Sequence, residues 1–275
     1  MEEGGDPIRW NQEILIPAQY PLLTKRIVLK VMDEDMTGDE VVGSILLDKK
    51  DILDGKYKGK YVWKNIYGSP MNMKNSKAKR EMNENPEIAS NWKGRVLLKI
   101  DCQKTEKPVA KVKYIVQEEV AKAAIHTKPK DYKILAEIGQ GIALPAEKKY
   151  QVRMIIGGHI IETDKSKTFQ KKNYNRYNQR FEEVIEKPYV DIMDFGNVII
   201  QLIDDKGRPV CYYKERINEF AKADADYKWV SLKPDLCVNQ VKDINLAGML
   251  SFKLSVVEGR DTDIPDLEAK ERKRK

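Results

Sequence analysis

Two regions of the chain show the alternation of apolar and polar residues, with a period of two, that is typical of β-strands. In the first region this pattern predicts strands near residues 11–16, 26–33, 40–48, 61–66 and 94–101. In the second it predicts strands at residues 132–143, 150–156, 159–163, 180–185, 197–204, 210–216, 228–232 and 248–257. Short strands with turn residues between them favour a mainly β fold of antiparallel β-sandwiches.

The stretches between these strands define the predicted domains. Residues 105–130 lie between Pro108 and Pro129 and carry apolar residues at helical spacing, which predicts a short amphipathic helix as a linker. Its polar face is mixed in charge, which favours packing between domains over insertion into lipid. Residues 68–92 are polar and are predicted to form a surface loop. We therefore expect domains at residues 1–104 and 131–258 and a charged tail at 259–275.

Composition narrows the functional classes. The chain has 275 residues, of which 41% are hydrophobic and 34% charged, which is typical of a soluble protein long enough for two domains. Its net charge of +7 indicates attraction to an acidic surface: phospholipid, nucleic acid or an acidic protein polymer. The sequence contains no long apolar window and begins with acidic residues, so we expect a cytoplasmic protein. With two histidines and no catalytic motif, we expect no enzyme.

One turn between two predicted strands is crowded with carboxylates, those of Asp33, Asp35, Asp39 and Glu40. Such crowding is unfavourable unless water or a cation compensates it, and calcium takes six to eight oxygen ligands. These residues are therefore candidate calcium ligands. A solvated acidic turn is the alternative.

One stretch of the second region is strongly basic. It interleaves cations with Phe169, Tyr174 and Tyr177, and the cations are Lys165, Lys167, Lys171, Lys172, Arg176 and Arg180. Such a cluster can bind the headgroups of an anionic membrane. A solvated face is the alternative, and nucleic acid is disfavoured because no nucleic-acid motif accompanies the cluster.

Several motifs in both regions carry a resemblance to a known family. They are DPIRWNQEILIP, IVLKVMDEDMTGDEVVG, WKNIYGSP and GRVLLKID in the first region, and NQRF, KGRPVCYYKERI, KWVSLK and GMLSFKLSV in the second. These segments resemble strands and loops of C2 domains, and the Y-G-S-P segment followed by G-R-V-L-L resembles those of the ferlin family. The resemblance implies tandem C2-type β-sandwiches, the first of which lacks its N-terminal strands and the first calcium-binding loop. We therefore expect the acidic turn to be half of a site and to bind calcium weakly or not at all.

The resemblance also implies a function. Ferlin-like C2 proteins suggest a non-catalytic protein, peripheral to membranes, that binds acidic phospholipid in calcium-linked vesicle traffic or fusion. Further C2 domains of the same or another chain would be partners, since the first domain needs something to complete its sheet. The alternative is a structural C2 protein of the cytoskeleton whose basic faces bind tubulin in the microtubules of a cilium or axoneme.

Overall fold

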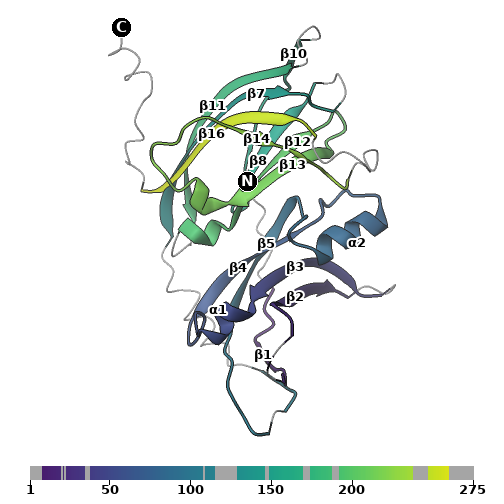
Figure 1. Cartoon of the computed structure of the whole chain (residues 1–275), viewed down its shortest axis with the longest axis vertical. Coiled ribbons are helices and arrows are strands. Elements are labelled where there is room, and N and C mark those ends of the chain that lie inside the picture. Colours follow the sequence, from purple (N-terminus) through teal and green to yellow (C-terminus); the bar gives the residue numbers. More distant parts are fainter. Residues whose placement is uncertain are drawn as a thin grey trace. The chain divides into compact units, whose positions relative to one another are not determined.

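Antiparallel β-sheets dominate the computed structural model (Figure 1). The structure describes residues 8–19, 21, 23–34, 38–107, 109–114, 129–145, 149–169, 174–187, 192–237 and 247–259. These residues fall in two compact units. The smaller unit comprises Met1–Ile27, Leu47–Val62 and Leu97–Lys128, and the larger comprises Val28–Leu46, Trp63–Val96 and Pro129–Lys275. The domain limits expected from the sequence stay predictions.

The C-terminal part of the larger unit is a β-sandwich of two five-stranded sheets. One sheet has the order β10-β11-β7-β16-β14, formed by Lys167–Phe169, Tyr174–Lys187, Lys130–Ile142, Met249–Glu258 and Lys228–Ser231. The other has the order β15-β13-β12-β8-β9, formed by Lys233–Pro234, Pro209–Arg216, Asn197–Ile203, Gln151–Ile156 and His159–Glu162. All eight strands expected in this region are present, which confirms the predicted fold class here.

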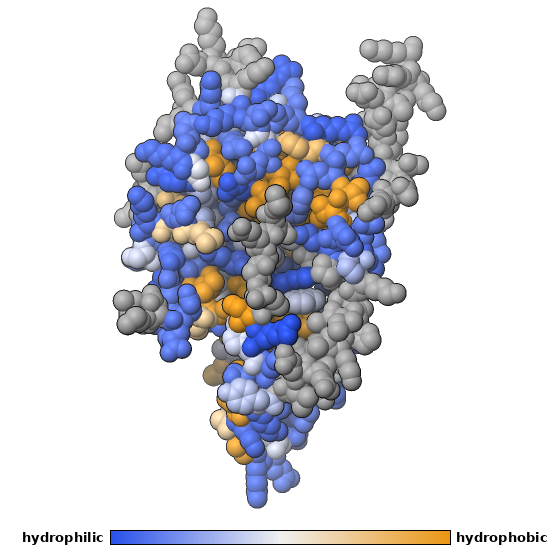
Figure 2. All heavy atoms as spheres, turned by 180° about the vertical axis from the view of Figure 1, so that it is seen from behind, coloured by the Kyte–Doolittle hydropathy of each residue, from blue (hydrophilic) through white to orange (hydrophobic). Residues whose placement is uncertain are grey.

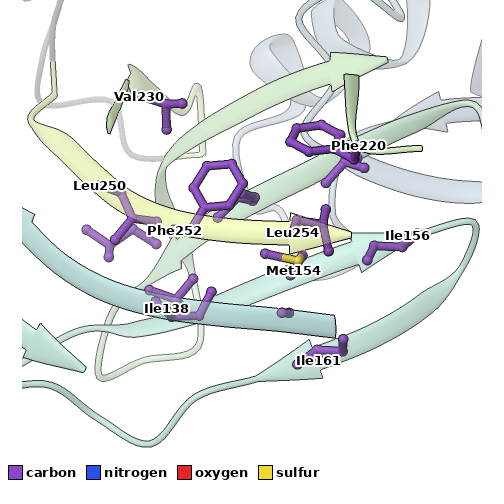
Figure 3. Packing of buried hydrophobic residues seen from close by; sticks show 14 of the residues in the cluster. Ile138, Met154, Ile156, Ile161, Phe220, Val230, Leu250, Phe252 and Leu254 are labelled. Atoms are coloured by element: carbon purple, nitrogen blue, oxygen red, sulfur yellow. The ribbon is translucent and has the colours of Figure 1, made fainter. Parts of the chain in front are cut away.

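The inward residues of both sheets form one core (Figure 3). Alternate residues of a strand face the same side, so Val198, Ile200 and Leu202 of β12 all reach this core. From the opposite sheet, Phe252 and Leu254 of β16 meet them. Figure 3 shows Phe252 and Leu254 with Ile138 of the adjacent strand β7 and Met154 of β8 in the opposite sheet. Burial of this apolar surface is the main stabilising contribution to the sandwich.

The strands expected in the first region are also present, although the first of them lies apart. A four-stranded sheet has the order β2-β3-β4-β5, formed by Arg26–Asp33, Glu40–Asp48, Tyr61–Gly68 and Asn91–Lys99. A short helix, α1 (Lys49–Leu53), follows β3, and the Asp48 carboxylate caps it by accepting a hydrogen bond from the Lys50 amide at 2.8 Å. Strand β1 (Gln12–Leu15) pairs instead with β6 (Lys111–Tyr114) in a separate two-stranded sheet.

Two expectations need correction. Within the predicted linker helix, residues 111–114 form strand β6, because their amide groups pair with β1; residues 115–128 lie outside the described residues. The predicted surface loop at residues 68–92 instead contains helix α2 (Ser76–Glu84), which begins where the Asn75 side chain accepts a hydrogen bond from the Ala78 amide at 3.1 Å. Ala78 and Met82, four residues apart, are both buried on one face of it.

Candidate functional site

The acidic turn lies where β2 meets β3. Asp33 is the last residue of β2, Asp39 precedes β3, and Glu40 begins it. Asp35 lies outside the described residues. The Glu40 carboxylate is paired with the Lys79 ammonium of α2 at 2.6 Å. The Lys79 ammonium therefore neutralises a carboxylate that the sequence suggests as a calcium ligand.

The space beside this turn is lined by charges of both signs. A cavity of about 450 Å³ lies between β2, β3 and α2, and its lining residues are Lys30, Met32, Asp39, Glu40, Val41, Ser76, Arg80 and Glu84. Glu84 Oε1 lies 3.3 Å from Lys30 Nζ and 3.3 Å from Arg80 Nε, and the hydrogen bond from Lys30, followed by that from Arg80, lowers the pKa of this carboxyl. No three His, Cys, Asp or Glu side chains in the described part of the chain lie together as a metal site. In the described part of the turn, Glu40 is paired with a lysine rather than gathered with other carboxylates.

Helix α2 is held against β3 by a buried asparagine. The Asn83 side-chain amide donates to the Val41 carbonyl at 2.6 Å, and its side-chain oxygen accepts from the Ser69 amide at 2.7 Å. The Ser44 hydroxyl donates to the Asn83 carbonyl at 2.7 Å. Because Asn83 is fully buried, each lost bond would leave an unpaired polar group at a cost of about 1–3 kcal/mol. These bonds fix Lys79 beside Glu40.

The basic cluster is divided among a loop and two strands. Lys165 lies in the loop before β10, Lys167 is the first residue of β10, and Arg176 and Arg180 are exposed on β11. Lys171 and Lys172 lie outside the described residues. In the register of the two strands, Lys167 stands directly opposite Arg176. The fold therefore brings these two positions of the cluster together at one end of the sheet.

Carboxylates partly compensate the rest of the cluster. Lys165 Nζ lies 3.2 Å from Asp205 Oδ1. Arg180 stands opposite Glu137 on β7 and lies 3.6 Å from the Glu182 carboxylate. The net positive charge of these two members of the cluster is therefore smaller than the sequence suggests.

The carboxylate of Asp204, in the loop after β12, accepts hydrogen bonds from several protein donors. Its carboxylate accepts from Arg208 Nη2 at 2.7 Å and Nε at 3.0 Å, and from the Lys206 and Arg208 amides at 2.9 Å each. Burial raises the pKa of this carboxyl, but these hydrogen bonds outweigh it and the net pKa is lowered. The Asp204 carboxylate therefore holds together the loop of residues 204–208, and its acceptor positions are occupied by protein donors.

Sequence reasoning missed the environment of one half-buried cation, Lys214 of β13. Its ammonium donates to the Pro86 carbonyl at 2.5 Å and the Ala89 carbonyl at 3.0 Å, and lies 4.1 Å from the centre of the Tyr67 ring. Burial lowers the pKa of this ammonium to about 7, opposed by Glu87. The alternation along β13 places Lys214 on the outer face, where the sequence predicts solvent. Nothing in the sequence indicates that residues 86–92 cover it.

The covering residues form a second, smaller core within the larger unit. Tyr67 and Ala89 pack with Ile155 of β8 and Ile199 of β12, and Trp92 adds to them. The Asn65 side chain donates to the Asp194 carbonyl at 2.8 Å, and the Asn197 amide donates to the Tyr67 hydroxyl at 2.7 Å. The outer face of the β8–β12–β13 sheet is therefore buried too.

Comparison with known proteins gives structural neighbours of the chain. No protein-family model matches the sequence. Solved structures similar to the chain include a single C2 domain of plant extended synaptotagmin 1, at 12% identity over 49% of this chain and 99% of that chain, with a TM-score of 0.35. A structure of two C2 domains of extended synaptotagmin 2 matches at 11% identity over 84% of this chain and 67% of that chain, with a TM-score of 0.35.

A third similar structure is an enzyme. Human GIVD cytosolic phospholipase A2 matches at 12% identity over 49% of this chain but only 16% of that chain, with a TM-score of 0.34. All three TM-scores lie below 0.5. The sandwich is defined by the strand pairing of this chain itself. In the described residues, no helix is both long and apolar enough to cross a bilayer.

Proposed function

We propose that this chain is a non-catalytic C2-type protein of the ferlin kind that binds acidic phospholipid membranes in vesicle traffic or fusion. The observation that carries the proposal is the opposed placement of Lys167 and Arg176 at the β10–β11 end of the sandwich. Each cation brought near a bilayer rich in anionic headgroups contributes about 1 kcal/mol. Motifs that resemble C2 strands, found in order along the chain, give the class of module.

Calcium is not required in this mechanism. In the acidic turn, Lys79 compensates Glu40, and in the sandwich, Arg208 occupies Asp204. Membrane attachment through the basic cluster therefore depends on ionic strength rather than on a metal. The salt dependence follows from screening, because the Debye length falls from about 10 Å at 0.1 M to about 3 Å at 1 M ionic strength.

The test is co-sedimentation of the full chain with vesicles of phosphatidylcholine alone or mixed with phosphatidylserine. Lys165, Lys167, Lys171 and Lys172 are replaced together by Ala. We expect weaker binding to the acidic vesicles, a flatter salt dependence and no change on adding calcium or a chelator. The matched control replaces four lysines of the larger unit outside the cluster, all exposed: Lys149, Lys206, Lys222 and Lys233.

An equal loss of vesicle binding in the control variant would mean that binding depends on the net charge of the protein and not on the cluster. Retained vesicle binding by the cluster variant would remove the cluster from the function. Wild-type binding to microtubules but to neither kind of vesicle would favour the cytoskeletal alternative. Thermal melts of both variants should match the wild type, since exposed lysines usually change stability by no more than about 0.5 kcal/mol each.

A further inference from the structure

The two-stranded sheet of the smaller unit, here called the β1–β6 ribbon, has one apolar and one charged side. Ile14 stands opposite Val112, and Tyr114 stands opposite Gln12. Because side chains alternate along a strand, Ile14, Val112 and Tyr114 share one side. The other side carries Glu13 opposite Lys113, with 3.7 Å between their charged groups, and Lys111 opposite Leu15. The ribbon is therefore amphipathic.

The apolar side of the ribbon faces solvent. Ile14 is 61% exposed, Val112 58% and Tyr114 82%. Just beyond β1, Ile16 and Trp10 are exposed as well. Figure 2 shows orange apolar residues among hydrophilic ones on the surface of the molecule. A two-stranded sheet is marginal alone in water, and a contiguous exposed apolar surface usually marks a binding site.

The charge of the same unit indicates what covers this side. The described residues of the smaller unit include thirteen Lys and Arg against six Asp and Glu. Three of these lysines, Lys111, Lys113 and Lys107, belong to β6 or to the segment just before it. The described part of the smaller unit is thus cationic, and the ribbon itself contributes to that charge. A partner must be both anionic and able to take up aliphatic and aromatic side chains.

An acidic bilayer meets both requirements. Lysines beside an apolar surface reach the headgroups while the aliphatic groups enter the acyl boundary, and Trp and Tyr prefer the interface between them. We propose that the β1–β6 ribbon is a membrane-contact site that inserts Ile14, Val112 and Tyr114 into the interface of an acidic bilayer. The inference shares the ligand class of the proposed function but places it on a different surface.

The test uses the full chain and vesicles of phosphatidylcholine with and without phosphatidylserine. Ile14→Ser with Val112→Ser removes the aliphatic pair while leaving every charge in place. We expect binding to acidic vesicles to weaken on the order of tenfold. The control, Ile160→Ser with Met71→Ser, removes two exposed apolar residues of the larger unit, which are 53% and 85% exposed, and should bind as the wild type does.

A second readout reports on the ribbon itself. Trp10 is 49% exposed, so its fluorescence should shift to the blue when acidic vesicles bury it. Trp10→Phe should remove that shift and leave the emission of the other three tryptophans. Unchanged binding of the Ile14 and Val112 variant together with no Trp10 shift would overturn the inference. So would a dimer in solution that this variant dissociates, because the ribbon would then be covered by a second copy.

The two proposals fail separately. If the lysine-cluster variant loses binding and the ribbon variant keeps it, the ribbon inference falls and the proposed function stands. If the ribbon variant loses vesicle binding and the cluster variant keeps it, the cluster is refuted as the binding site and the inference about the ribbon is supported. Absence of wild-type binding to either vesicle overturns both.

Discussion

Strand β12 and the β1–β6 ribbon are both antiparallel β-structure, yet one is covered on both sides and the other on neither. In β12, Val198 and Ile200 face the sandwich core, while Ile199 and Gln201 on the opposite side are also buried. Segment 65–92, far away in the sequence, supplies the second cover. Every residue of the ribbon strands is exposed. A strand's surroundings depend on which distant segment reaches it.

The sequences of the two strands reflect this difference. β12 reads NVIIQLI, a nearly continuous apolar run of the kind found in strands buried on both faces. β6 reads KVKY, a strict alternation that needs a cover on only one side. The comparison predicts that losing the cover of β12 is costly and that altering the ribbon is not. Three measurements can break or sharpen it.

The largest effect should come from separating the segments that cover each other. In residues 1–104 expressed alone, Tyr67 and Trp92 lose Ile155 and Ile199, and Pro86 and Ala89 lose Lys214. We expect that fragment to show no cooperative unfolding transition, because exposed apolar faces and open sheet edges remain. A thermal melt followed by circular dichroism checks this, with the full chain as control. A sharp melt from the fragment would contradict the prediction.

An intermediate effect should appear in the pH dependence of stability through Lys214. Burial lowers the pKa of this ammonium to about 7, while the unfolded chain has the ordinary value of 10.5. Between these values the unfolded state binds more protons than the folded state. The free energy of unfolding should therefore rise with pH across this window, with a contribution of at most about 1.4 kcal/mol per pH unit.

The variant Lys214→Met tests that dependence. It should lose the rise with pH and should also be less stable, by about 1–3 kcal/mol at high pH, because the Pro86 and Ala89 carbonyls lose their donor. Urea titrations at several pH values measure both effects. Lys222→Met, at an exposed lysine of the same unit, is the control. A slope in Lys214→Met equal to that of the wild type would place the pH dependence elsewhere.

The sequence predicted the positions of the strands better than the structure of the segments that connect them. Alternation located all eight expected strands of the sandwich, yet β11 begins at Tyr174 rather than at residue 180. Polar and basic residues fill its first half, and a register shift between Arg176 and Gln179 interrupts the alternation there. Helix α2 was not predicted because few of its residues are apolar. Its main anchor is Asn83, a polar residue of the kind usually found on the surface.

The candidate sites were likewise predicted only in part. The residue types in the acidic turn and the basic cluster are visible in the sequence, but their compensation is not. Lys79 meets Glu40 because α2 folds back onto β3, and Lys165 meets Asp205 across 40 positions of sequence. Charge pairs of long sequence separation depend on the tertiary fold. Sequence alone therefore overestimates both the negative charge of the turn and the positive charge of the cluster.

The smallest effect is expected in the ribbon. Ile14→Ser removes an aliphatic side chain that is 61% exposed and stands opposite the similarly exposed Val112. Little apolar area leaves a buried environment, so the free energy of unfolding in the absence of lipid should change by no more than about 0.5 kcal/mol. Ile199→Ala, at a fully buried isoleucine of β12, is the comparison and should cost about 2–5 kcal/mol. Equal losses in these two variants, measured by urea unfolding, would mean that the ribbon is covered in solution, and the contrast between β12 and the ribbon would no longer hold.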